Sequence, residues 1–236
     1  MSNNINGPAN PWEQADGDQY TSNISRKIPG YQLQYELMDT LLTAQLDRQE
    51  QPRLLVVGAG GGQEILTLGR NHPDWRFCGL DTSAPMLKTA RQRIAAAGIT
   101  AQAELHHADI CSWSGGGYDA ATCMLVLHFV QGRGSKLALL QAIAARLKPG
   151  APLLISAING DPASRAWQVQ MAGWRLHMLR GGIGQEQGEA FTASFGVTSH
   201  PLPAEEMELL LEQAGFTSLS RYFGSYLIDG WVALKR

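Results

Sequence analysis

Residues 54–64 read LLVVGAGGGQE, so four apolar residues run directly into four glycines within five positions. The apolar run predicts a short buried strand over 53–57, and the residues that follow the glycines predict a helix over 62–70. A flexible linker would not need the strand, whereas a ligand that lies against bare backbone needs both features. A tight strand-to-helix turn without a ligand is the alternative, although a plain turn needs only a single glycine.

The remaining apolar pattern predicts alternating strands and helices. Strands separated by helices indicate βαβ units and a parallel sheet, and right-handed crossovers place helices on both faces of that sheet. Further strands are expected over 75–81, 101–109, 118–130 and 152–158, and helices over 30–48, 83–98 and 135–150. After residue 160 the pattern predicts helices over 164–182 and 203–216, a loop over 183–200 and a strand pair over 217–236 around Gly224. The predicted fold class is α/β.

Length and composition bound the class of protein. The chain has 236 residues, 44% of them apolar, and a net charge of −2, which suits a globular protein without a general attraction to nucleic acid. No apolar run approaches the roughly 20 residues of a membrane span. Three scattered cysteines without a CxxC pair predict a cytoplasmic location. The polar start lacks the features of a signal peptide and predicts a mobile arm over 1–25, followed by a single domain over 26–236 with cap segments over 26–50 and 161–200.

The spacing of the glycines limits the choice of ligand. A dinucleotide fingerprint, G-x-G-x-x-G, would place its third glycine where this chain has Gln63. The observed G-x-G-x-G pattern fits a nucleoside without a pyrophosphate better than NAD, and no Gly-Lys-Ser/Thr follows to form a phosphate loop. Gly58 is expected to turn the chain with a positive φ, while Gly60 and Gly62 let a ligand approach the backbone.

Two aspartates close the second and third predicted strands. Asp81 can accept both hydroxyls of a ribose, or it can cap the helix over 83–98 in place of its Thr and Ser neighbours. Asp109 would in the same geometry face an adenine amino group, with Ile110 or Met86 against the ring. The alternative for Asp109 is a loop aspartate that caps a turn.

The order of these motifs resembles that of the class I S-adenosylmethionine (SAM) dependent methyltransferases. It consists of the glycine-rich turn, the two strand-ending aspartates, YDAATCMLVLHF and RLKPGAPLLIS, and the likeness covers residues 28–236. The resemblance implies a Rossmann-like seven-stranded sheet with an antiparallel last strand, helices on both faces and a helical cap. It also implies SAM as the cofactor and S-adenosylhomocysteine (SAH) as its product.

A narrower resemblance points to the carboxy-SAM synthases of wobble-uridine tRNA modification. It rests on IPGY (28–31), LDTSAPMLKTARQRI (80–94) and FGSYLIDGWVALKR (223–236). The resemblance implies cofactor contacts from the Tyr of the PGY motif, the glycine-rich turn, an Asp-polar pair and an Asp-Ile pair. In this chain these positions are Tyr31, Gly58, Ala59, Gly60, Asp81, Thr82, Asp109 and Ile110.

The chain departs from these families at three positions. Met124 stands in the fourth strand where carboxy-SAM synthases have an Asn, and it is still expected to contact the cofactor. Leu210 stands where those enzymes have an Arg. Many methyltransferases carry an acidic residue two positions before the first glycine, where this chain has Val56, so contacts to the methionine end of the cofactor would come from Glu64 or Gln63.

Methyl transfer depends mainly on placing the acceptor in line with the methyl carbon. His128, at the end of the fourth predicted strand, is the candidate general base; the alternative is a half-buried histidine with a satisfied hydrogen bond. Tyr31 is the second catalytic candidate, as a wall of the methyl channel or as a packed aromatic residue. His106 and His107 are neighbours in a strand and point to opposite faces, so no metal site is expected.

The sequence therefore predicts a SAM-dependent methyltransferase acting on a small-molecule acceptor, with segment 161–200 over the acceptor pocket. Arg165, Arg175 and Arg180 of this segment could bind an acidic substrate or tRNA, or form a solvated face. A carboxy-SAM-like synthase or tRNA-modification enzyme and a non-catalytic SAM-binding protein stay open as alternatives. An NAD enzyme is the weakest alternative, and the sequence leaves the acceptor, the methylated atom and the oligomeric state open.

Overall fold

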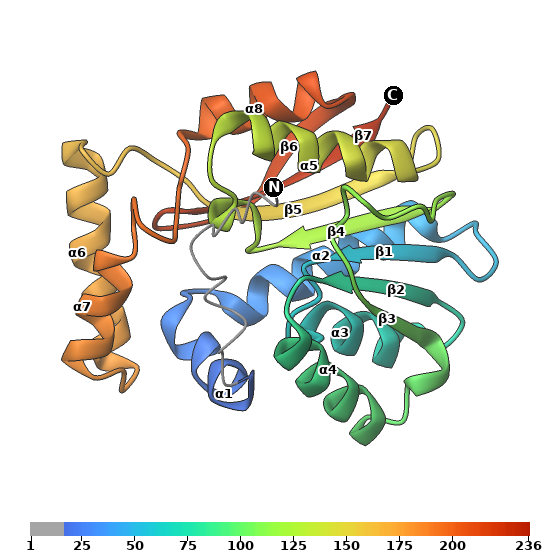
Figure 1. The fold of residues 1–236 in the computed structure, drawn as a ribbon, viewed down its shortest axis with the longest axis horizontal. Coiled ribbons are helices and arrows are strands. Elements are labelled where there is room, and N and C mark those ends of the chain that lie inside the picture. Colours follow the sequence, from blue (N-terminus) through green and yellow to red (C-terminus); the bar gives the residue numbers. More distant parts are fainter. Residues whose placement is uncertain (1–16) are drawn as a thin grey trace, which may run out of the picture.

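Seven strands form one sheet in the order β3-β2-β1-β4-β5-β7-β6 (Figure 1). The computed structural model describes residues 17–236, apart from the side chains of residues 18–20. The strands are β1 (Arg53–Val57), β2 (Arg76–Asp81), β3 (Ala103–His107), β4 (Ala120–Met124), β5 (Pro152–Ile158), β6 (Phe216–Ser225) and β7 (Ile228–Lys235). Strands β1 to β5 pair in parallel, whereas β7 lies antiparallel between β5 and β6. The predicted seven-stranded sheet with an antiparallel last strand is confirmed.

Helices cover both faces of the sheet, as predicted. Helices α2, α3 and α4 lie on one face and α5 and α8 on the other, while α6 and α7 stand beyond the carboxyl ends of the parallel strands (Figure 1). The helices are α1 (Gly17–Lys27), α2 (Tyr31–Leu46), α3 (Gln63–Asn71), α4 (Ala84–Ala96), α5 (Arg133–Arg146), α6 (Arg165–Arg180), α7 (Gln185–Ala193) and α8 (Ala204–Gln213). Two short 3₁₀ segments, η2 (Thr100–Gln102) and η3 (Leu127–Phe129), precede β3 and follow β4.

The alternation of side chains along β1 divides the core into two layers. Leu54 and Val56 point toward the layer under α2, α3 and α4, and Leu55 and Val57 point toward the layer under α5 and α8. Successive side chains of a strand face opposite sides, so a strand covered on both faces must be apolar throughout. This requirement explains the continuous apolar run before the glycines.

Two strand boundaries differ from the prediction. The fourth strand ends at Met124 instead of continuing to residue 130, because Leu125 takes a left-handed conformation with φ of 58° and the chain then turns into η3. In the terminal hairpin Gly224 pairs with Asp229 within the ladder, and the turn lies further on, at Tyr226, with φ of 48°. Leucine and tyrosine rarely adopt such conformations, so neither turn could be recognised from its residue type.

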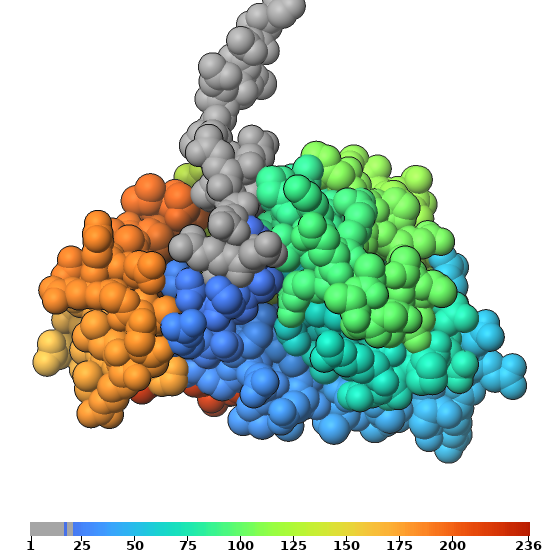
Figure 2. All heavy atoms as spheres, turned by 90° about the horizontal axis from the view of Figure 1, so that it is seen from below, coloured from blue at the N-terminus to red at the C-terminus, as the bar shows by residue number. Residues whose placement is uncertain are grey.

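The cap contains more helix than the sequence predicts. Residues 183–200 were expected to form a loop, but α7 lies within them; only Gly188 of this helix is buried, so no apolar period marks it. Trp174 of α6 is fully buried, and its indole N–H donates to the backbone oxygen of Lys27 at 2.6 Å. The cap helices thus pack against α1, and Figure 2 shows α6 and α7 (orange) beside α1 and α2 (blue).

The predicted division of the chain stays a prediction. Residues 1–16 of the expected mobile arm lie outside the described residues, and residues 17–27 form α1. The assignment of 26–50 and 161–200 to a cap around a single domain stays a prediction as well; α2 of the first segment packs on the sheet with α3 and α4.

Candidate active site

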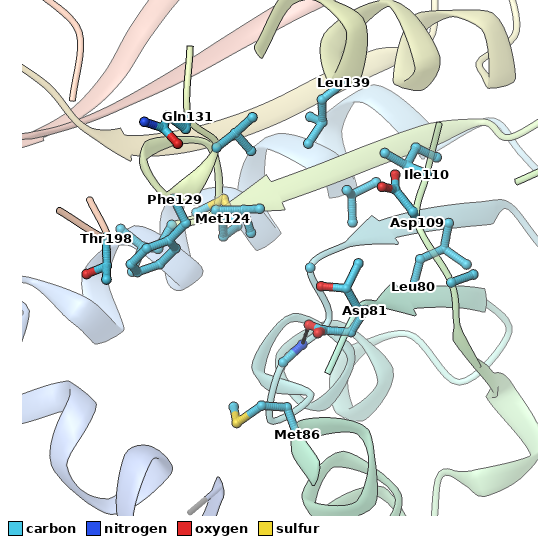
Figure 3. Close-up of a pocket in the computed structure, with 18 of the residues that line it drawn as sticks. Leu80, Asp81, Met86, Asp109, Ile110, Met124, Phe129, Gln131, Leu139 and Thr198 are labelled. Carbon is cyan, nitrogen blue, oxygen red and sulfur yellow. Dashed lines mark hydrogen bonds between the residues drawn. The ribbon is translucent and has the colours of Figure 1, made fainter. Parts of the chain in front are cut away.

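A cavity of about 450 Å³ opens at the carboxyl ends of β1, β2 and β4. Val57, Asp81 and Met124, the last residues of these strands, all line it. Its other walls come from the glycine-rich turn, from η3 and the residues after it, and from the segment that follows α7. In Figure 3 Phe129 and Thr198 lie across the cavity from Asp109 and Ile110. Ligands bind at this edge of open α/β sheets, and the volume suits a small ligand.

The glycine-rich turn is built by left-handed backbone at Gly58 and Gly60. Their φ angles are 70° and 48°, and the amides of Gly58 and Ala59 donate to the backbone oxygen of Leu80 at 2.8 and 2.9 Å. A Cβ on Gly58 would collide with the side chain of Val126. A Cβ on Gly60 would meet nothing nearer than 3.7 Å, where Met86 Cε of the cavity wall lies. Gly58 is therefore required by packing, whereas Gly60 keeps open space at the cavity.

Asp81 links the glycine-rich turn to the start of α4. Its Oδ2 accepts from the amide of Gly60 at 2.7 Å, and its Oδ1 accepts from the amide of Ser83 at 2.7 Å. Burial raises the pKa of Asp81, while these two amides act in the opposite direction. The cap of α4 itself is Ser83, whose hydroxyl accepts from the Met86 amide. Since a carboxylate offers about four acceptor sites, each oxygen of Asp81 can still accept a hydrogen bond from a ribose hydroxyl.

Asp109 lines the cavity and also forms a turn. Its Oδ1 accepts from the amide of Cys111 at 2.8 Å, and its backbone oxygen accepts from the amide of Ser112 at 3.1 Å. The capping role that the sequence left open is thus present. Ile110 and Met86 are each 3% exposed and line the same cavity.

The cavity brings together most of the predicted cofactor residues. It is lined by Gly58, Gly60, Asp81, Thr82, Met86, Asp109, Ile110 and Met124. Ala59 is not among the lining residues, because its side chain is buried against Gly79. Gly62 is the N-cap of α3, and a Cβ there would press on Ala90 of α4, so this glycine serves helix packing. Tyr31 packs edge-to-face on Tyr35 at 4.9 Å, away from the lining, and burial raises its pKa.

His128 does not occupy the place that the sequence predicted. It lies in η3, is 3% exposed and is not among the residues that line the cavity. Burial, with a contribution from Lys136, lowers the pKa of His128 to about 3. Its Nδ1 accepts from the Ile158 amide at 3.3 Å, which leaves the proton of the neutral ring on Nε2. This arrangement corresponds to the buried, hydrogen-bonded histidine and does not favour a general base.

Several cavity residues were not predicted. Phe129, Gln131 and Leu139 follow β4, and Val197, Thr198 and His200 come from the cap. His200 is held in place by its backbone amide, which donates to the His128 oxygen at 2.6 Å. The only signal for these residues was their position, since residue 131 follows a predicted strand and residue 200 ends the predicted cap.

Among residues 17–236 no three His, Cys, Asp or Glu side chains are placed to hold a metal ion. His106 and His107 illustrate the reason, because His106 packs on Trp113 while His107 contacts the backbone oxygen of Thr82. Within the same range no helix is long and apolar enough to cross a membrane.

A sheet of this order, with a glycine-rich turn and two aspartates at its carboxyl edge, has the class I methyltransferase fold that the sequence predicted. The comparisons with known proteins agree. A model of the family described as "Methyltransferase domain" matches residues 55–153. The fold, this match and the relatives described next support the resemblance to class I SAM-dependent methyltransferases that the sequence predicted.

Curated relatives carry a more particular name. The chain is 29% identical over 172 residues to the ubiquinone biosynthesis O-methyltransferase of Xanthomonas axonopodis pv. citri (strain 306), and 28% identical to that of Xanthomonas campestris pv. campestris (strain B100). Each match covers 72% of this chain and 66% of the relative. The chain thus matches just under two thirds of the length of these relatives.

Solved structures share the fold. The magnesium protoporphyrin IX methyltransferase of Synechocystis PCC 6803 with bound SAH superposes with a TM-score of 0.69 at 16% identity, over 95% of this chain and 96% of that one. A putative O-methyltransferase of Nostoc punctiforme PCC 73102 gives a TM-score of 0.67 at 17% identity, over 93% of this chain and 60% of that one. At such identities the likeness concerns the fold alone.

Proposed function

We propose that this chain transfers a methyl group from SAM to the oxygen of a small phenolic acceptor. The observation that carries the proposal is the cavity in which the strand-end aspartates and the residues of η3 and the cap face one another (Figure 3). The cofactor would lie against Gly58, Gly60, Thr82, Met86 and Met124, with its ribose on Asp81 and its adenine between Asp109 and Ile110. We place the reaction in the cytoplasm, without nucleic-acid partners.

The acceptor end of the cavity favours an apolar ring with one polar group. Phe129 and Val197 offer apolar surface there, and Thr198 and His200 offer hydrogen-bonding groups. A phenol presents the same combination. The name of the curated relatives, which act as O-methyltransferases in ubiquinone biosynthesis, supports oxygen as the methylated atom.

The chain's own groups would position the acceptor and receive its proton. SAM supplies the methyl group on a positively charged sulfur, and the methyl carbon passes to the phenol oxygen as the carbon–sulfur bond breaks. Phe129 would keep water from the acceptor, and the His200 ring would take the phenol proton. Among the lining residues that the structure describes, Asp81 and Asp109 are the other titratable ones, and both already accept backbone amides at the cofactor end.

Turnover with a panel of acceptors tests the proposed reaction. The full-length protein is incubated with SAM and matched phenols, anilines and thiols of equal ring size, and SAH formation is measured. We expect SAH with the phenols, whose hydroxyl proton the His200 ring would take. SAH binding without turnover for any phenol would contradict the proposal and favour the non-catalytic SAM-binding alternative.

Substitutions can distinguish the roles of His200 and His128. His200→Ala should lower kcat by about 100-fold, the lower range of general-base effects, with the affinity for SAH unchanged. His128→Asn should keep most of the activity, because an amide oxygen can still accept from the Ile158 amide. Both variants are compared by kcat at saturating SAM. A large loss of kcat in His128→Asn with little loss in His200→Ala would instead identify His128 as the base.

The carboxy-SAM alternative receives less support. An extra carboxylate in a partly desolvated site needs a cationic partner, and no lysine or arginine is among the lining residues that the structure describes. Leu210 is fully buried in the core between the sheet and α8. Of the more distant cations, Arg221 is paired with Asp229 at 2.9 Å. Plain SAM therefore fits the cavity better.

A further inference from the structure

Lys136 of α5 is a lysine that lies inside the core. It is 2% exposed, and in the described part of the chain it forms no ion pair with a carboxylate. Lysines are almost never fully buried unless they are paired. Burial lowers the pKa of Lys136 to about 8, so the ammonium form still dominates at pH 7. A charge that is kept at this cost indicates a role that an apolar side chain could not fill.

The ammonium group of Lys136 holds one wall of the cavity from its buried side. This acceptor wall, residues 125–131, includes η3, and its members Val126 and Phe129 line the cavity on either side of Leu127. Lys136 Nζ donates to the backbone oxygen of Leu127 at 2.6 Å. The lining residues that the structure describes do not include Lys136, but they include Leu139, which follows it by one turn of α5. Lys136 therefore stands directly behind the acceptor wall.

The acceptor wall begins with a strained residue. Leu125 has φ of 58°, a left-handed conformation that leucine rarely adopts. Such backbone persists only where surrounding contacts hold it, and it is typical of functional sites. The Leu125 amide donates to Ser156 Oγ at 3.2 Å, and this hydroxyl donates to Gln34 Oε1 at 3.1 Å. Polar groups of β5 and α2 thus fix the start of the wall, while Lys136 of α5 fixes its middle.

We infer that Lys136 is a positioning residue for methyl transfer, which fixes the acceptor wall so that the acceptor lies in line with the methyl carbon. The proposed base depends on the same wall, because the His200 amide donates to the oxygen of His128, the residue after Leu127, at 2.6 Å. A displacement of about 1 Å can cost 100-fold in rate, so the wall must be held firmly. The inference rests on the proposed transfer of a methyl group to a phenol in this cavity.

Lys136→Met tests the contact without an acceptor. Methionine is unbranched and apolar and has no donor, so the hydrogen bond to the Leu127 oxygen is lost. We expect the amides of Phe129 and Val130 to exchange with deuterated water about 10-fold faster or more, which corresponds to the loss of a hydrogen bond from a charged donor. Thermal stability should stay equal or rise, because a buried charge is replaced by an apolar group.

Turnover measures the consequence for the reaction. The probe is catechol or, if catechol is not methylated, the phenol of the acceptor panel that gives the most SAH. Lys136→Met should lower kcat/KM for this phenol by about 10- to 100-fold. Its affinity for SAH should stay within about twofold of the wild-type value, because Asp109 at the cofactor end lies across the cavity from Phe129 (Figure 3).

Lys148→Met is the matched control for the loss of a lysine. Lys148 has a side chain that is 54% exposed, and it pairs with Asp119 at the amino ends of β1 and β4, away from the cavity. This variant should keep the wild-type kcat/KM and the wild-type exchange rates at Phe129 and Val130.

The outcomes of these measurements are distinct. Unchanged exchange at Phe129 and Val130 in Lys136→Met, or an unchanged kcat/KM, would overturn the inference. Parallel losses of thermal stability, SAH affinity and turnover would also overturn it, because Lys136 would then support the whole fold. A wild-type protein that forms no SAH with any phenol would contradict the proposed function and with it the role of Lys136 in transfer. The exchange rates would still decide whether Lys136 holds the wall.

Discussion

Gly60→Val should strongly weaken SAM and SAH binding while the protein stays folded. The Cβ of residue 60 would point into open space beside Met86 at the cavity, so the added methyl groups would occupy the volume proposed for the ligand. Overfilling a packed contact costs roughly 1–3 kcal/mol even where neighbours relax, and a left-handed valine adds about 1–2 kcal/mol of backbone strain. We expect affinity for SAH, measured by calorimetry, to fall by about 100-fold or more.

Gly98→Val is the matched control for backbone strain. Gly98 also has a positive φ, of 73°, but it lies beyond α4, a Cβ there would meet nothing within 4 Å, and it is not among the cavity residues. Both variants should lose similar thermal stability, and only the Gly60 variant should lose the ligand. An unchanged SAH affinity in Gly60→Val would remove the turn from the binding site.

Asp81→Ala should weaken cofactor binding and stability together. Both carboxylate oxygens already accept backbone amides, so the substitution frees the turn at Gly60 and the start of α4 at Ser83. Loss of the charged acceptor for the ribose hydroxyls should cost roughly 2–3 kcal/mol of affinity, about 30- to 150-fold. Calorimetry with SAH and thermal unfolding would measure the two effects separately.

Asp119→Ala separates stability from binding. Asp119 is 6% exposed and accepts from the Arg53 amide at 2.9 Å, but it lies at the amino ends of β1 and β4, away from the cavity. Asp119→Ala should lower the thermal stability of the protein and leave its affinity for SAH unchanged. If Asp81→Ala behaves in the same way, its carboxylate serves only the turn and the helix start, and the ribose contact is excluded.

Local constraints made the centre of the site predictable. The run from Leu54 to Val57 must be apolar because both faces of β1 are covered, and the glycines must follow because Gly58 has no room for a Cβ. Asp81 was predictable because a short carboxylate at the end of the second strand can reach the turn after the first. Each of these signals depends on residues that are close in the chain or paired in the sheet.

The acceptor side depends on contacts between distant segments, so the sequence alone predicted it poorly. The turn at Leu125 is held by Ser156, whose backbone oxygen and hydroxyl both accept from the Leu125 amide, at 2.8 and 3.2 Å. This turn carries His128 into the interior. His200 reaches the cavity because its amide pairs with His128 across many residues of intervening chain. Neither pairing leaves a periodic pattern in the sequence.

The identity of the bound ligand tests the central claim most directly. The full-length protein is incubated with equal amounts of SAM, SAH, carboxy-SAM and NAD, desalted and denatured, and the released ligand is identified by mass spectrometry. A cavity with two aspartates and no lining lysine or arginine among the described residues should retain SAM and SAH. Retention of mainly carboxy-SAM or NAD, or of none of the four, would contradict the assignment of this cavity to SAM-dependent methyl transfer.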